Sequence, residues 1–351
     1  MKIANKSIGI ESEPFIIAEM SGNHDNSLEK ALAIVDAAAK AGVSALKLQT
    51  YTADTLTLDV NKKEFKIDDL NSLWHGESLY DLYSKAHTPW EWHETLFERG
   101  RQLGITVFST PFDHTAVDFL EECGAPAYKI ASFEIVDLPL IEKVCETGKP
   151  IIVSTGMADE SEIEEAVSLA ERLGCQDLAL LHCVSAYPAL PEESNLKTIK
   201  YLEDKFGKVV GLSDHTLGTT VSTVAVGLGA RIIEKHVTLS RKDAGSDSAF
   251  SLEPSELQIL TRDCRIAWEC LGHEGPHQAQ NEMKNQIFRK SIYAVKDIPE
   301  GARIAESDVK VIRPGYGLKP KFMGDVIGRR ASRQILRGTA LAWDMFETSE
   351  K

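Results

Sequence analysis

Two histidines mark the ends of two consecutive apolar runs in the second half of the sequence. VVGLSDH ends at His215, and RIIEKHV contains His236. Two neutral imidazoles that lie close together can hold a divalent metal ion, with water and a substrate oxygen completing the coordination. Glu234 precedes His236 by two residues and shares its face in an extended strand, so it could be a further ligand or could support one. The two histidines could instead act as a general acid and a general base.

Lysine and hydroxyl side chains end several other apolar runs. Ammonium and hydroxyl groups are the donors that a bound phosphate or carboxylate needs. These donors are Lys47, Thr110, Lys129, Ser132, Ser154 and Ser213. The chain carries 39 Lys and Arg against 53 Asp and Glu, a formal charge of −14. So acidic a protein is not expected to bind nucleic acid or anionic membranes non-specifically, and an anionic ligand would need basic groups gathered in one place.

Polar residues follow the remaining runs as well. The first run ends at Glu19, the second contains Gln49, the fourth is followed by Glu134, and the sixth by Ser185 and Tyr187. A buried polar group without a partner costs about 1–3 kcal/mol, so packing alone does not explain this bias at every run. We expect a functional site where the ends of these runs meet.

The runs themselves are predicted strands, and helical patterns follow most of them. The strands cover residues 15–20, 44–50, 105–110, 127–132, 150–156, 177–183, 209–215 and 231–237. The helices cover residues 28–40, 114–123, 138–147, 160–173, 195–206 and 218–228, and a last one starts near Glu253. Strands alternating with helices of this length imply right-handed crossovers and a parallel sheet. The pattern favours an α/β fold, a (β/α)8 TIM barrel. An open, doubly wound sheet is the rival, but no GxGxxG turn follows the first strand.

The chain is predicted to have three parts. We expect a TIM-barrel catalytic domain over residues 1–271, a linker without apolar periodicity over 272–287, and a compact, mostly β module over 288–351. One connection in the barrel, residues 51–88, is unusually long. Long loops after barrel strands lie over the active face, so this segment could be a lid or a contact surface, or its tryptophans could pack on the barrel rim.

The cellular location is also predicted from the sequence. No stretch approaches the ~18–20 apolar residues that span a bilayer, and the start, MKIANKSIGIESEPF, has no apolar core of a signal peptide. The six cysteines form no CxxC pair and no regular framework, as is usual for reduced thiols. We expect a cytoplasmic protein without membrane or nucleic-acid partners.

Eight motifs occur in an order that is typical of one enzyme family. They are FIIAEMSGNH, ALKLQT, VFSTPF, AYKIASFE, IIVSTGM, LLHCVSAYP, GLSDHT and IIEKHVT. Together they resemble the sialic acid synthase family, transferases that condense phosphoenolpyruvate with an amino sugar to give nonulosonic acids. The module over 288–351 resembles the antifreeze-like (SAF) β-clip domain of that family. EMSGNH and residues 73–93 are most similar to its pseudaminic acid branch, whereas N-acetylneuraminate synthases usually begin with EIGxNHNG and carry Asn at the position of Ser185.

The resemblance implies roles for individual residues. Phosphoenolpyruvate would be held by Lys47, Thr110, Lys129, Ser132, Ser154, Ser185 and Ser213. The sugar, 2,4-diacetamido-2,4,6-trideoxy-L-altrose, would contact Gln49, Glu134, Tyr187 and Asp247, and also Phe288 and Arg313 from a partner subunit. His215 and His236 would take part in catalysis by binding Mn2+, with Co2+ or Mg2+ as alternatives. Glu19 and Glu134 would stabilise cationic character or move protons. The implied assembly is a homodimer with swapped C-terminal domains.

Three other interpretations remain open from the sequence. A sister enzyme of the same family would make N-acetylneuraminate or legionaminate. A Schiff-base aldolase would form an imine on Lys47 or Lys129. A sugar-binding protein without catalytic activity would depend on the C-terminal module.

Overall fold

The computed structural model describes residues 1–68, 74–243, 245–276 and 279–347. The chain forms two compact units, Met1–Gly272 and His273–Lys351, each with its own apolar core. Part of the predicted long connection, including the first residue of the 73–93 motif, lies outside the described residues. Within the described ranges, no helix has both the length and the apolar character needed to span a bilayer.

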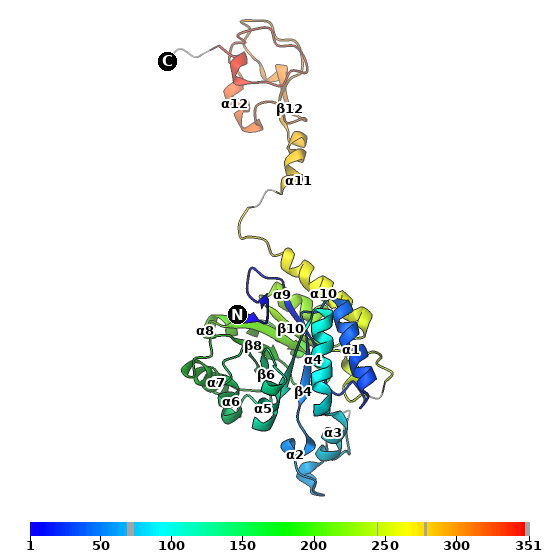
Figure 1. Ribbon diagram of the computed structural model, residues 1–351. Coiled ribbons are helices and arrows are strands. Elements are labelled where there is room, and N and C mark those ends of the chain that lie inside the picture. The colour runs from blue at the N-terminus through cyan, green and yellow to red at the C-terminus, as the bar shows by residue number, and fades with distance from the viewer. Residues whose placement is uncertain (69–73, 244, 277–278, 348–351) are drawn as a thin grey trace. The chain divides into compact units, whose positions relative to one another are not determined.

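The first unit contains a closed barrel of eight parallel strands, and the predicted TIM barrel is confirmed (Figure 1). β10 pairs with both β9 and β3, and the pairing of His236 with Glu19 closes the barrel. Each strand overlaps its predicted range, and its ends differ from the predicted ends by at most two residues. The strands are β3 (Phe15–Glu19), β4 (Ala45–Thr50), β5 (Thr106–Pro111), β6 (Tyr128–Ile130), β7 (Ile151–Ser154), β8 (Leu178–Cys183), β9 (Val209–Asp214) and β10 (Ile232–His236).

The side chains that point into the barrel change from apolar to polar along the strands. Because side chains alternate, every second residue of a strand faces inward. Ile17 and Ala45 belong to an apolar cluster inside the barrel. Two residues further along the same strands, Glu19 and Lys47 are also buried. The first half of each of these strands therefore supplies apolar side chains to the core inside the barrel, and the second half supplies polar side chains.

A short hairpin adds to the apolar cluster. β1 (Lys2–Ile3) pairs antiparallel with β2 (Lys6–Ser7). Ile3 and Ile8 are both buried in the cluster that contains the apolar residues of the strands. Apolar packing therefore fills the amino-terminal end of the barrel, and the polar carboxyl end is the one where a ligand can bind.

Helices surround the barrel and bury one apolar face each (Figure 1). Local sequence fixes their ends: the Ser27 hydroxyl accepts a hydrogen bond from the Lys30 N–H at the start of the first helix, and Gly42 ends that helix in the left-handed conformation. The helices that match predicted ranges are α1 (Leu28–Ala41), α5 (His114–Glu122), α6 (Leu138–Cys145), α7 (Glu160–Arg172), α8 (Thr198–Phe206), α9 (Thr220–Gly227) and α10 (Pro254–Glu269).

The helix α4 (His93–Leu103) was not predicted from the sequence. It provides the crossover between β4 and β5, and its buried residues are His93, Leu96, Phe97 and Gly100. Their i, i+3, i+4, i+7 spacing is typical of a helix that packs by one face. The signal was therefore present in the sequence, directly after the long connection.

The long connection contains α2 (Ala53–Leu56) and α3 (Leu79–Ala86) in its described parts. Tryptophans in and after it support both interpretations made from the sequence. Trp90 stacks on Phe119 with ring centroids 4.6 Å apart, as packing on the rim predicts. Trp74 instead lines a cavity, and its indole N–H donates to the Ser246 carbonyl at 3.1 Å.

The second unit is small and rich in β structure. β11 (Ser291–Ala294) pairs antiparallel with β12 (Val309–Ile312), and α12 (Met323–Val326) contributes Val326 to the core of the unit. α11 (Gln280–Met283) lies in the stretch predicted as a linker, which is therefore partly helical in its described residues.

Candidate active site

The carboxyl ends of the barrel strands surround a cavity of about 520 Å³. Both predicted lysines and both predicted histidines line this single cavity. The predicted site residues in its lining are Lys47, Gln49, Lys129, Ser132, Glu134, Ser154, Ser185, Tyr187, Ser213, His215, His236 and Asp247. Glu19 and Thr110 are buried on the same strands, where Glu19 contacts Lys47 and Thr110 pairs with Gln49 in the sheet. The structure thus brings together the groups that the strand ends predicted.

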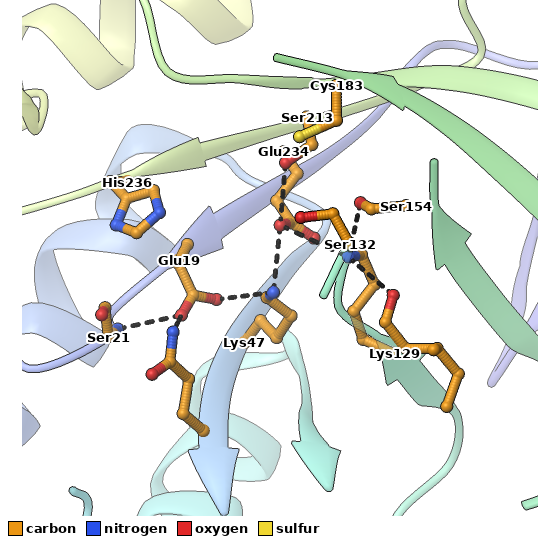
Figure 2. A network of polar contacts seen from close by, with 12 residues as sticks. Glu19, Ser21, Lys47, Lys129, Ser132, Ser154, Cys183, Ser213, Glu234 and His236 are labelled. Atoms are coloured by element: carbon orange, nitrogen blue, oxygen red, sulfur yellow. Dashed lines mark hydrogen bonds and ion pairs between the residues drawn. The ribbon is translucent and has the colours of Figure 1, made fainter. Parts of the chain in front are cut away.

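A buried network of charges forms one side of the cavity (Figure 2). The Lys47 Nζ lies 3.1 Å from Glu19 Oε2 and 3.0 Å from Glu234 Oε1. The Lys129 Nζ lies 3.9 Å from Glu234 Oε1 and donates to the Ser154 hydroxyl at 2.6 Å. Glu234 therefore contacts both lysines through one carboxylate oxygen, while its other oxygen, Oε2, has no hydrogen-bond partner among the described residues.

The pKa values in this network follow from burial and from the neighbouring charges. Burial raises the pKa of Glu19 to about 7, against the opposing effect of Lys47. Burial would also raise the pKa of Glu234, but Lys129 and Lys47 outweigh it and lower that pKa to about 2. Burial lowers the pKa of Lys129 to about 8, whereas Glu19 and Glu234 overcome the effect of burial on Lys47 and raise its pKa. The Glu19 carboxyl group and the Lys129 ammonium group can therefore each gain or lose a proton near neutral pH.

Serine hydroxyls extend the network toward the cavity. The Ser132 and Ser185 hydroxyls lie 2.8 Å apart, and the Ser213 hydroxyl donates to Glu234 Oε1 at 3.2 Å. Gly156 makes this packing possible: it has φ +47°, and a Cβ atom there would lie 2.4 Å from the Cβ of Ser132. The two ammonium groups and the nearby hydroxyls form a set of donors suited to a phosphate or a carboxylate.

The two histidines lie side by side at the ends of β9 and β10. Their ring centroids are 5.4 Å apart. The His215 Nδ1 lies 2.9 Å from the Val184 carbonyl oxygen, so in the neutral ring Nδ1 carries the proton and Nε2 keeps a lone pair. Burial lowers the pKa of His236 well below its ordinary value, so its ring is neutral at pH 7. His236 therefore presents the neutral form of imidazole that binds metal ions. Burial would lower the pKa of His215 as well, but its contact with Cys183 outweighs burial and raises that pKa, so a metal ion would displace a proton from this ring.

A metal ion at this position would need oxygen ligands from outside the protein. Among the described residues, no three His, Cys, Asp or Glu side chains are grouped so that they could hold a metal ion. The His236 Nδ1 is nevertheless buried without a hydrogen-bond partner and lies 3.6 Å from Asp247 Oδ2. Two imidazoles that leave several coordination positions to water or substrate fit a catalytic metal better than a structural one.

Buried polar atoms without a hydrogen bond gather at the same place. In the part of the chain that the structure describes, these atoms are Glu19 Oε2, Thr110 Oγ1, Glu134 Oε2, Glu234 Oε2 and His236 Nδ1. The Glu19 oxygen has only its ion-pair contact with Lys47. Buried polar atoms normally have hydrogen-bond partners, so a cluster of exceptions is where a ligand is expected to supply them.

Another part of the cavity lining is apolar and was not predicted. α3 contributes Leu79, Leu82, Tyr83 and Ala86, whose i, i+3, i+4, i+7 spacing gives the helix one apolar face. Leu56, Ile67, Trp74 and Phe112 add to the same lining. The spacing was visible in the sequence, but an apolar helix face normally packs on the core, and here it lines the cavity.

The remaining predicted residues have different surroundings. Tyr187 packs on His215 with ring centroids 4.4 Å apart. Burial raises the pKa of Glu134 to about 7. Phe288 and Arg313 belong to the second unit, where both side chains are exposed, and their role at the cavity stays a prediction.

Replacing Lys47 with methionine tests the charge network. The substitution leaves Glu19 and Glu234 buried without their shared cation, and breaking a buried ion pair from one side costs about 3–5 kcal/mol. We expect Lys47→Met to lower the free energy of unfolding by about this amount, measured by urea denaturation at pH 7.5. The matched control is Lys200→Met, which removes an exposed ammonium that pairs with Glu203 and Asp204 and should leave the midpoint nearly unchanged. An equally small effect of Lys47→Met would contradict the network.

Comparison with known proteins identifies the family. Residues 34–275 match the NeuB family and residues 289–347 match the SAF domain. The pseudaminic acid synthase of Campylobacter jejuni serotype O:2 is 42% identical over 99% of this chain and 100% of its own. The N,N'-diacetyllegionaminic acid synthase of Legionella pneumophila is 37% identical over 95% of this chain and 94% of its own. The crystal structure of the N-acetylneuraminic acid synthetase of Leptospira borgpetersenii in complex with citrate has 34% identity and a TM-score of 0.73, covering 81% of this chain and 94% of that one. The resemblance carried by the eight motifs is confirmed, and the chain belongs to the NeuB family.

Proposed function

We propose that this chain condenses phosphoenolpyruvate with 2,4-diacetamido-2,4,6-trideoxy-L-altrose and water to give pseudaminic acid and phosphate. The observation that carries the proposal is a single cavity that combines ammonium and hydroxyl donors, two adjacent imidazoles and an apolar part of its lining. Relatives named pseudaminic acid synthase support the choice of product, because they match nearly the whole chain at 42–43% identity.

Phosphoenolpyruvate binds the charged side of the cavity in this proposal. Its phosphate and carboxylate carry the negative charge that Lys47 and Lys129 attract, and the serine hydroxyls supply further donors. The unpartnered Thr110 hydroxyl would gain a hydrogen bond in the same way. The residues assigned to this substrate are Lys47, Thr110, Lys129, Ser132, Ser154, Ser185 and Ser213.

The sugar binds next to this charged side and the apolar part of the lining. Gln49, Glu134, Tyr187 and Asp247 offer the polar groups that its hydroxyl and amide groups need. Its two acetamido methyl groups and its deoxygenated C6 are apolar, and the face of α3 offers them a surface of the same kind. A fully hydroxylated sugar would leave polar groups unsatisfied against that face.

His215 and His236 would hold a divalent ion, for which Mn2+ is our first choice and Co2+ or Mg2+ are alternatives. When bound, the ion acts as a Lewis acid toward the aldehyde oxygen of the open-chain sugar. The protein fixes both imidazoles in place, because Val184 accepts from His215 and the β9–β10 pairing positions the two strand ends.

The reaction forms one carbon–carbon bond and one carbon–oxygen bond to water, and it breaks the carbon–oxygen bond to the phosphate. C3 of phosphoenolpyruvate attacks the aldehyde carbon, and cationic character develops at C2. Water adds at C2, and phosphate leaves with the bridging oxygen. Glu19 and Glu134 are the carboxylates assigned to stabilise the cation or to take the proton of the water, because the pKa of each is raised to about 7 by burial.

We also propose that a homodimer completes the site, with the second unit of one subunit covering the cavity of its partner. Exposed apolar side chains support this assembly, because such patches mark contact surfaces. Phe288 and Tyr316 are 60% and 69% exposed in the second unit. The loops after four barrel strands expose Phe133, Met157, Leu190 and Leu217. Phe288 and Arg313 are the residues assigned to reach the sugar.

The choice of sugar can be tested by offering the candidates side by side. The precursors of pseudaminate, N,N'-diacetyllegionaminate and N-acetylneuraminate are each incubated with phosphoenolpyruvate, and phosphate release is measured. We expect the L-altrose derivative to give the highest kcat/KM. A preference for either of the other sugars would assign the chain to a sister activity.

The same reaction separates the synthase from a Schiff-base aldolase, which the lowered pKa of Lys129 makes the second candidate. Phosphoenolpyruvate carrying 18O at the bridging position should give 18O-labelled phosphate. Borohydride should trap no pyruvate adduct on the protein. An adduct on Lys129 would favour the aldolase.

Removal of the metal tests the role of the two histidines. Chelation should abolish turnover, and Mn2+ should restore it. His236→Ala should lower kcat by at least about 100-fold and weaken Mn2+ binding measured by calorimetry, since the ion would lose one of two protein ligands. His114→Ala is the control, because His114 is exposed and outside the cavity lining. Unchanged turnover of His236→Ala at saturating metal would remove the metal step.

Subunit complementation tests the swapped dimer. Arg313→Ala and His236→Ala should each be impaired as homodimers. A purified heterodimer of the two variants should have about half of the wild-type activity, because one of its two sites combines an intact barrel with an intact second unit from the partner. Arg333→Ala in the second unit is the control. A heterodimer with no more activity than its parents would show that each site uses its own chain.

A further inference from the structure

The turn after β3 contains an unusual serine conformation. Ser21 has φ +48°, in the left-handed region. Asp25 and Asn26 of the same turn have φ values of +50° and +51°, but Asp and Asn adopt this region far more readily than other residues with a Cβ atom. A serine held there is strained, and such strain persists where the surroundings require it, often at functional sites.

Ser21 makes two hydrogen bonds with residues at the cavity. Its backbone N–H donates to Glu19 Oε1 at 3.1 Å, and its hydroxyl donates to Asp247 Oδ2. Ser21 is only 4% exposed, and it lines the cavity together with Asp247. Figure 2 shows Ser21 beside Glu19, with His236 on the adjacent strand.

Other residues already fasten the loop of Asp247 to the turn of Ser21. The Asn23 amide donates to the Val237 carbonyl at 2.9 Å and to the Ser251 hydroxyl at 2.8 Å. The two backbones also approach closely, because a Cβ atom on Gly22 would lie 2.5 Å from the Ser246 hydroxyl. The Ser21 hydroxyl is therefore not needed to join the loops, and its effect is on the orientation of the Asp247 carboxylate.

That orientation matters because of what faces Asp247. The Asp247 side chain is 11% exposed, and its Oδ2 lies 3.6 Å from the His236 Nδ1, which has no hydrogen-bond partner. We infer that Ser21 is a positioning residue, which holds the Asp247 carboxylate beside His236 so that it can accept a hydrogen bond from a hydroxyl or amide N–H of the sugar. The identity of this ligand rests on the proposed function.

Two substitutions of Ser21 separate this role from a purely structural one. Both Ser21→Gly and Ser21→Ala remove the hydroxyl, but only glycine also removes the backbone strain. The glycine variant should therefore melt about 2–4 °C above the alanine variant. Both should lose kcat/KM for the sugar to the same extent, about tenfold, with the KM for phosphoenolpyruvate unchanged. In an Asp247→Asn background, Ser21→Gly should cause no further loss.

A structural role would give a different result. Activity would then follow stability, and Ser21→Gly would keep wild-type kcat/KM, which would overturn the inference. Asn26→Gly is the matched control, because it relieves a similar φ in the same turn at an exposed position and should leave kcat/KM unchanged.

A crystal structure of Ser21→Gly gives a readout that does not depend on turnover. The inference predicts that Asp247 Oδ2 moves away from its position 3.6 Å from His236 Nδ1, and an unmoved carboxylate would overturn it. Absence of turnover in the wild-type protein with every candidate sugar would instead overturn the proposed function. The two failures are therefore distinguishable.

Discussion

Charge balance inside the barrel is the constraint on which the rest of the structure depends. Two ammonium groups and two carboxylates lie where little water reaches them, and each would cost several kcal/mol to bury alone. Lys47 lies between Glu19 and Glu234 and satisfies both. Lys129 keeps hydroxyl neighbours and a lowered pKa at the cavity. The site is thus neutralised without a ligand, yet it still offers donors to an anion.

Position along a strand decides whether an inward side chain serves packing or chemistry. Ile152 lies in the apolar cluster of the barrel, and Ser154, two residues later, accepts a hydrogen bond from Lys129. A shift of one residue in the pairing of a strand would turn its inward-facing side chains outward. The strand register that closes the barrel therefore also positions the side chains of the site. The pairing of His236 with Glu19 illustrates this, since it joins the last strand to the first and sets a predicted metal ligand beside the charge network.

Those features of the fold and the site that are encoded locally could be predicted from the sequence. The strands and their polar ends were predictable because alternation and end polarity are visible within a few residues. The partners of Glu234 were not, since Lys47 is 187 residues away in the chain. The apolar face of α3 was visible, but only the folded chain shows that it lines the cavity. Ser21 was missed because its contact with Asp247 spans 226 residues, and no local pattern marks its backbone conformation.

The amino-terminal hairpin has a consequence for the order in which the two substrates bind. Ile3 and Ile8 complete the apolar packing at one end of the barrel, and the lysines line a cavity at the other end, which also contains the residues proposed to bind the sugar. We expect phosphoenolpyruvate, which is proposed to bind at the lysines, to enter before the sugar. A sugar molecule that binds first would block the entry of phosphoenolpyruvate. Substrate inhibition by the sugar would then result from a barrel that is closed at one end, without any regulatory site.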